Sequence, residues 1–159
     1  MKRMRGSALL ALALVAALGV LSCSKTNNHG AASNVYQSGC LEGIDQTNGW
    51  DETLTLDWNG QDLRLVHTNV CWNCGFKILV SQSVDAGVLD VQEANSGHTV
   101  DACDCLFEYK YTLNSILAGD YQFQMRIEDA ADPIFDETIN LPDGTKHYDF
   151  TRHDDGTCP

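Results

Sequence analysis

Strict alternation of residue type in "CDCLFEYKYTL" (103–113) is the feature that most constrains the fold of this chain. In a β-strand successive side chains point to opposite faces, whereas a helix would scatter the same residues around its axis. One face of the predicted strand is therefore apolar and carries Cys103, Cys105, Phe107, Tyr109, Tyr111 and Leu113, and the other carries Asp104, Glu108 and Lys110. We expect a strand that takes two sulfur atoms and several aromatic rings into a dry interior.

The same period of two recurs along the chain. In "TLTLDWNGQDLRLVH" the pair Asn59-Gly60 stands between alternating apolar residues, which predicts a hairpin because both turn positions favour positive φ. A two-residue turn would pair Leu56 with Leu63, Leu54 with Leu65 and Glu52 with His67. Further strands are predicted at 76–80, 88–91, 121–127, 134–139 and 146–151.

This pattern predicts an all-β fold. About seven short strands punctuated by turns, with no amphipathic helix after the leader, are typical of a single antiparallel β-sandwich, immunoglobulin-like or similar. We place this domain at residues 37–159, because the 137 residues from Cys23 onward suit one domain. The rings of Trp50, Trp58 and Trp72 are expected in its core, with a sugar-binding platform as the alternative.

The amino-terminal segment indicates export. Residues 1–22 combine three cations with a short apolar run, which is typical of a secretion signal rather than a membrane span. The stretch "VLSC" before and including Cys23 resembles the lipobox of bacterial lipoproteins, although Leu21 stands where a small residue is usual. That resemblance implies cleavage before Cys23, acyl chains such as palmitate on it, and, with Ser24 next, the outer membrane. Residues 23–36 are expected to form a flexible tether.

The charge of the mature chain limits its partners. From Cys23 onward seven Lys and Arg stand against twenty-two Asp and Glu, a formal net charge of −15. Such a chain repels phosphate backbones, so nucleic acid is excluded as a partner. The membrane, reached through the lipid, and an envelope protein or glycan remain as the expected partners.

Six cysteines remain once Cys23 is assigned to lipid: Cys40, Cys71, Cys74, Cys103, Cys105 and Cys158. An even number in an exported chain predicts disulfides. A bond between Cys40 and Cys158 would join the two ends of the domain. The other four cysteines suit two bridges, from 71 and 74 to 103 and 105, whose pairing the sequence leaves open.

A metal or redox centre is the alternative for the central cysteines. Cys71, Cys74, Cys103 and Cys105 offer four thiolates for zinc, Cu(I) or an iron–sulfur centre, and His67, which shares strand parity with Cys71, is a fifth candidate ligand. A working thiol pair in "CWNC" is the redox variant, but no βαβ pattern surrounds it. The preferred interpretation of His67 is a core histidine paired with Glu52 or with a backbone carbonyl. His147 and His153 are expected to be exposed.

One group of proteins shares several of these motifs. "HTNVCWNC", then "CDCLFEYKYTL" and "GDYQFQMRI", resemble a pattern in small secreted bacterial lipoproteins that have no assigned activity. The resemblance covers about residues 63–127 and carries over to His67, Asn69, Asn73, Cys74, Cys103, Cys105, Tyr109, Gly119 and Tyr121. Cys71, Gly75 and Phe107 depart from the group's pattern. The resemblance implies an anchored β-domain and no particular reaction.

The sequence thus favours a non-enzymatic, lipid-anchored envelope protein that acts as a binding or structural module without a cofactor. The alternative is a metal-binding protein for zinc or copper, or a thiol-redox protein. A third and less favoured hypothesis is a hydrolase of surface glycans, which would require two carboxylates about 5 to 9 Å apart in a cleft.

Overall fold

The computed structural model describes residues 28–41, 49–96, 104–128 and 130–154. These residues form ten strands and no helix, which confirms the all-β prediction. The strands are β1 (Asn28–Ala31), β2 (Ser33–Gln37), β3 (Trp50–Trp58), β4 (Leu63–Asn73), β5 (Ile78–Asp85), β6 (Val88–Asn95), β7 (Asp104–Leu113), β8 (Gly119–Ile127), β9 (Phe135–Leu141) and β10 (Lys146–Asp154). In this part of the chain there is consequently no helix capable of crossing a bilayer.

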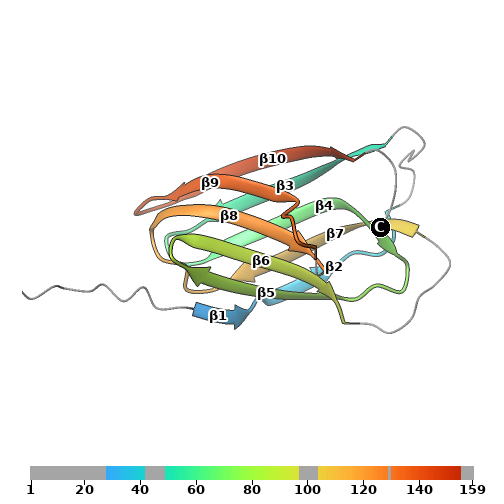
Figure 1. The fold of residues 1–159 in the computed structure, drawn as a ribbon, viewed down its shortest axis with the longest axis horizontal. Helices are drawn as coiled ribbons and strands as arrows, with labels where there is room; N and C mark the ends of the chain where they lie inside the picture. Colours follow the sequence, from blue (N-terminus) through green and yellow to red (C-terminus); the bar gives the residue numbers. More distant parts are fainter. Residues whose placement is uncertain (1–27, 42–48, 97–103, 129, 155–159) are drawn as a thin grey trace, which may run out of the picture.

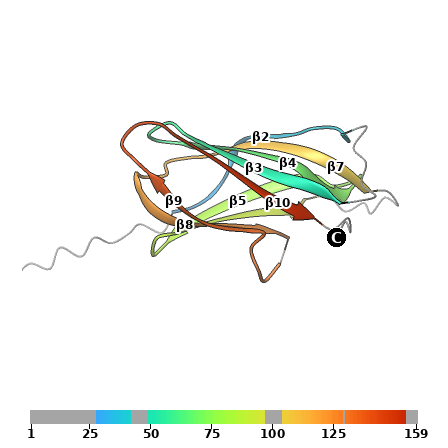
Figure 2. The same ribbon diagram turned by 90° about the horizontal axis from the view of Figure 1, so that it is seen from above.

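The strands form a sandwich of two five-stranded sheets (Figures 1 and 2). The first sheet has the order β1-β5-β6-β8-β9 and the second the order β10-β3-β4-β7-β2. All paired strands are antiparallel except β6 and β8, which are parallel. That exception follows from the path of the chain, which crosses to the second sheet as β7 before it returns as β8.

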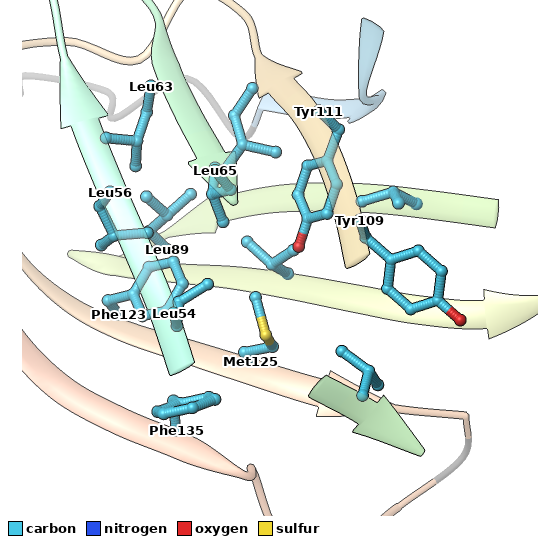
Figure 3. Close-up of a cluster of buried hydrophobic side chains, with 14 of the residues drawn as sticks. Leu54, Leu56, Leu63, Leu65, Leu89, Tyr109, Tyr111, Phe123, Met125 and Phe135 are labelled. Atoms are coloured by element: carbon cyan, nitrogen blue, oxygen red, sulfur yellow. The ribbon is translucent and has the colours of Figure 1, made fainter. Parts of the chain in front are cut away.

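Alternation builds the core between the two sheets (Figure 3). On β7 the predicted inward residues Cys105, Phe107, Tyr109, Tyr111 and Leu113 are all buried. Facing strands of the first sheet contribute residues such as Leu89, Phe123 and Met125, none of which is exposed to solvent. Trp50, Trp58 and Trp72 are also buried, which agrees with the core reading rather than the sugar platform.

The β3–β4 hairpin has a longer turn than the sequence predicted. Leu56 pairs with Leu65 and Leu54 with His67, so the register differs by two residues and Glu52 does not stand directly opposite His67. The Asn59 side chain accepts hydrogen bonds from the backbone N–H groups of Gln61 and Asp62, which stabilises a four-residue turn. A slip of two residues keeps every side chain on its face, so the predicted core is unaffected.

The start of the domain also differs from the prediction. Residues 28–36, assigned to a flexible tether, lie largely in β1 and β2. β1 pairs with β5 in the first sheet, and β2 pairs with β7 in the second. The segment is polar because both strands lie at sheet edges, where solvent covers one side, and a hydrophobic pattern therefore could not reveal them. Residues 1–27, including the predicted signal and Cys23, lie outside the described residues, as do Cys103 and Cys158.

Candidate functional site

The largest group of ionisable side chains in the interior is centred on His67. This residue of β4 is 0 % exposed, and its Nε2 lies 2.6 Å from Glu52 Oε1 on β3. Its Nδ1 lies 3.0 Å from Glu93 Oε2 on β6, in the opposite sheet. The predicted pairing of His67 with Glu52 is thus confirmed, whereas Glu93 was not foreseen.

Two further residues complete this group, which we call the His67 network. Arg152 of β10 donates to Glu52 Oε2 from Nε at 3.1 Å and from Nη2 at 2.6 Å. The Tyr111 hydroxyl donates to Glu93 Oε1 at 2.6 Å, and Figure 3 shows it directed into the core. Of the five residues, Arg152 alone has substantial exposure, with 32 % of its side chain accessible.

The charges of the network balance. Burial disfavours the imidazolium form of His67, but the charge of Glu93 and the hydrogen bonds to both glutamates outweigh it and raise the His67 pKa to about 9. Burial likewise works to raise the Glu52 pKa, yet His67 and Arg152 together lower it. Two cations then face two carboxylates, so the interior carries no net charge from this group.

The network joins the two sheets and is closed to reactants. Both ring nitrogens of His67 are occupied by carboxylates, and the rings of Phe135 and Tyr109 lie against it with centroids 5.7 and 6.5 Å away. A general base must reach the proton it removes, directly or through one water. An imidazole enclosed in this way is suited to holding β6 against β3 and β4 rather than to catalysis.

A disulfide joins Cys40 to Cys105, with Cα atoms 5.4 Å apart. The predicted bond between Cys40 and Cys158 is therefore wrong, and so is the predicted bridge from Cys105 to Cys71 or Cys74. After β2 the chain continues beside β7, where Ser38 N donates to Glu108 O and Leu41 N donates to Leu106 O. This course brings Cys40 to the apolar face of β7, a neighbourhood that follows from sheet order and not from spacing along the sequence.

Cys71 and Cys74 are also disulfide-bonded, and they lie in different surroundings. Cys71 packs with Trp50 and Leu106 in a small second cluster, whereas Cys74 packs against the main core. The Sγ atoms of Cys40, Cys74 and Cys105 all lie within 4.8 Å of one another. Of the four thiols predicted as metal ligands, Cys74 and Cys105 are thus close together.

A β-bulge explains why His67 and Cys71 do not belong to one site. The register of β4 against β7 shifts between Thr68 and Val70, and Asn69 in between has a φ of 60°. One extra residue reverses the alternation, so that Val70 and Trp72 pack in the main core with Leu65 while Cys71 does not. The equal parity of His67 and Cys71 predicted from the sequence is therefore wrong.

The outer face of the first sheet carries a shallow polar cavity of about 220 Å³. Its lining consists of Gly30, Ser81, Gln82, Ser83, Asp90 and Gln92, and Asp90 forms an ion pair with Arg126. On the outer face of the second sheet His147 and His153 are exposed, as predicted, and contact Asp57 and Asp51 at 2.6 and 3.0 Å. Of these surface features, the cavity is the one that forms a hollow, and at about 220 Å³ it is smaller than most ligand pockets.

We compared the chain with models of known protein families, with curated proteins and with solved structures. No match was found in any of the three comparisons.

Proposed function

We propose that the chain is a non-enzymatic binding module, anchored by lipid on Cys23 at the cell envelope, with the outer membrane as its site. The observation that carries the non-enzymatic part is the enclosure of His67, 0 % exposed with a carboxylate on each ring nitrogen. The oxidised state of Cys40, Cys71, Cys74 and Cys105 supports the exported location, because disulfides persist in oxidising compartments.

The anchor is tested by metabolic labelling. Cells expressing the full chain are grown with an alkyne-tagged fatty acid, and the purified protein is coupled to a fluorophore. We expect a labelled protein in the membrane fraction, and an unlabelled one when Cys23→Ser is introduced, because the thiol that receives the diacylglyceryl group is then missing. Label that persists in Cys23→Ser would contradict the assignment of the anchor.

The polar cavity suggests the class of ligand. Ser81 and Ser83 offer hydroxyl groups, Gln92 offers its amide oxygen, since its Nε2 already donates to Glu128 O, and Asp90, which forms an ion pair with Arg126, offers a carboxylate. This combination suits the hydroxyl groups of an envelope glycan. Soluble envelope glycan fragments should shift the NMR signals of these residues, and Ser83→Ala with Gln92→Ala should abolish the shifts. Shifts confined to other surfaces would exclude the cavity as the glycan site.

A second candidate function is metal binding or thiol exchange, favoured by the three sulfur atoms within 4.8 Å of one another. Thiolates of this number suit zinc or Cu(I). The bond between Cys40 and Cys105 does not fit that role, since it leaves neither sulfur as a thiolate. Thiol titration of the denatured mature protein decides: absence of free thiols supports structural disulfides, and free thiols accompanied by stoichiometric metal support the metal site.

A further inference from the structure

The chain enters the domain at one end of the sandwich. Asn28, the first residue of β1, pairs with Val84 beside the β5–β6 turn. The turns 59–62, 86–87, 114–118 and 142–145 all lie at this same end (Figure 1). Contacts among them confirm this arrangement, because Ser115 N donates to Asp62 Oδ1 and Trp58 Nε1 donates to Pro142 O. We call these four turns the turn end.

The distance from the anchor to the turn end is short. Residues 24–27 separate Cys23 from β1, so the two Cα atoms of Cys23 and Asn28 are at most about 18 Å apart. The strands of the second sheet, such as the nine-residue β3, are about 30 Å long. A flexible tether as far as residue 36 would have let either end of the sandwich approach the bilayer. Because β1 pairs with β5, the turn end is instead held near the anchor.

We propose that the domain rests on the bilayer with its turn end, and that the end carrying the Cys40–Cys105 disulfide points away from the membrane. This orientation depends on the anchor at Cys23 proposed above. The turn end is then the surface that contacts the membrane, and its partner is the headgroup region of a neutral, zwitterionic lipid surface.

The most exposed apolar side chain supports this orientation. Leu117, in the turn 114–118, is 71 % exposed, more than any other large hydrophobic residue among those described. Its carbonyl accepts a hydrogen bond from Tyr121 Oη at 2.9 Å, which fixes the backbone of the turn. An exposed leucine gains free energy when it enters the interface between headgroups and acyl chains.

The faces of the two sheets are less suited to lipid. The first sheet presents the Asp90–Arg126 ion pair, and the second presents the pairs of His147 with Asp57 and of His153 with Asp51. Bringing these groups against acyl chains would remove water from charged atoms, which is unfavourable. A domain lying flat on either sheet is therefore disfavoured relative to one standing on its turns.

Charges at the turn end select the lipid. Asp85 and Asp143 are exposed there, Asp62 is partly exposed, and the nearby cation Lys146 lies over the ring of Tyr148 at 5.5 Å from its centroid. Three carboxylates against one cation disfavour an anionic surface. We expect contact with phosphatidylcholine or phosphatidylethanolamine, and weaker contact when phosphatidylglycerol is added.

Depth-dependent quenching of tryptophan fluorescence tests this orientation. The full lipidated protein is reconstituted into phosphatidylcholine vesicles that contain lipids spin-labelled near the headgroup. Two variants are compared: Leu117→Trp at the turn end and Lys77→Trp, an exposed position just before β5 at the opposite end. The native Trp50, Trp58 and Trp72 are buried in both and give a common background, which is measured on the parent chain.

The emission added by Leu117→Trp should shift to the blue and lose about half its intensity, whereas that added by Lys77→Trp should change little. Equal quenching of the two probes, or stronger quenching at residue 77, would overturn the orientation. Mass spectrometry of the amino-terminal peptide separates the two proposals. Without lipid on Cys23 the anchor is refuted and the orientation with it, whereas with lipid present and Leu117→Trp unquenched the orientation alone is refuted.

Discussion

The charge on His67 should make the stability of the domain fall in mildly alkaline solution. The His67 pKa is about 9 in the folded protein, against an ordinary value of 6.5. Between these two values the unfolded chain has lost the His67 proton while the folded chain retains it. The contribution of this proton to stability is therefore fully present below pH 6.5 and is lost as the pH rises through about 9.

The loss of stability can be worked out from the rise in the His67 pKa. A rise from 6.5 to about 9 corresponds to about 3 kcal/mol, since each pKa unit is worth 1.36 kcal/mol at 25 °C. Solvent screens these charges little, because His67, Glu93 and Glu52 are at most 1 % exposed. This is a large fraction of the total stability of a small domain.

Urea denaturation measures this contribution directly. Tryptophan fluorescence is followed at pH values from about 6 to about 10, with the disulfides intact, and the free energy of unfolding is plotted against pH. We expect a decline of about 3 kcal/mol across this range. Replacing His67 by Gln should remove the decline and lower stability near neutral pH, because a buried ion pair is broken.

Exposed histidines supply the control for that experiment. His153 has 63 % of its side chain accessible, and its one ion pair among the described residues is with Asp51. His153→Asn should therefore leave the decline of stability with pH in place. A flat profile in the parent chain, or a decline that survives His67→Gln, would refute the reasoning.

Three further predictions concern the core, the disulfide and the hairpin. Tyr111→Phe should destabilise the domain by about 2 kcal/mol, since it deprives the Glu93 carboxylate of a hydrogen bond, whereas Tyr109→Phe should be nearly neutral, because its buried hydroxyl has no partner among the described residues. Equal losses in chemical denaturation would show that ring packing, not the hydrogen bond, decides. Replacing both Cys40 and Cys105 by Ala should cost about 4 kcal/mol, as expected for a bond that closes a loop across a sequence separation of 65, and an unchanged denaturation midpoint would mean that this bond does not constrain the unfolded chain. Asn59→Ala should lower the thermal midpoint through a loss of about 1 kcal/mol, because two backbone N–H groups of the turn lose their acceptor, and a midpoint equal to that of the parent would argue against the side-chain cap.

Alternation predicted the fold well because burial of one face leaves a direct mark on the sequence. The segment around Tyr109 is buried on the predicted face from Cys105 to Leu113. The predictions that were wrong concern local features set by single residues, which the alternation of residue types does not reveal. Asn59 lengthens a turn by two residues, and Asn69 inserts a bulge that turns Cys71 away from His67.

Part of the His67 network could be predicted from the sequence, namely the part that lies within one hairpin. His67 and Glu52 lie on the same face of neighbouring strands of one hairpin, where they are diagonal neighbours, because His67 pairs with Leu54. Glu93 comes from the opposite sheet, and Arg152 is 100 residues from Glu52 in the sequence. One signal for Glu93 was present: it shares parity with Leu89 and Val91, and a charged residue on the buried side of a strand indicates a buried partner.

The pairing of β3 with β10 has a consequence for how the chain can be delivered. A strand near the beginning of the domain obtains its outer neighbour from residues 146–154, so a polypeptide emerging amino terminus first cannot complete the second sheet until that segment is free. Such long-range closure slows folding. If the chain is exported as proposed, threaded through a secretion channel in an extended form, late completion would keep it in a transportable state until passage has ended.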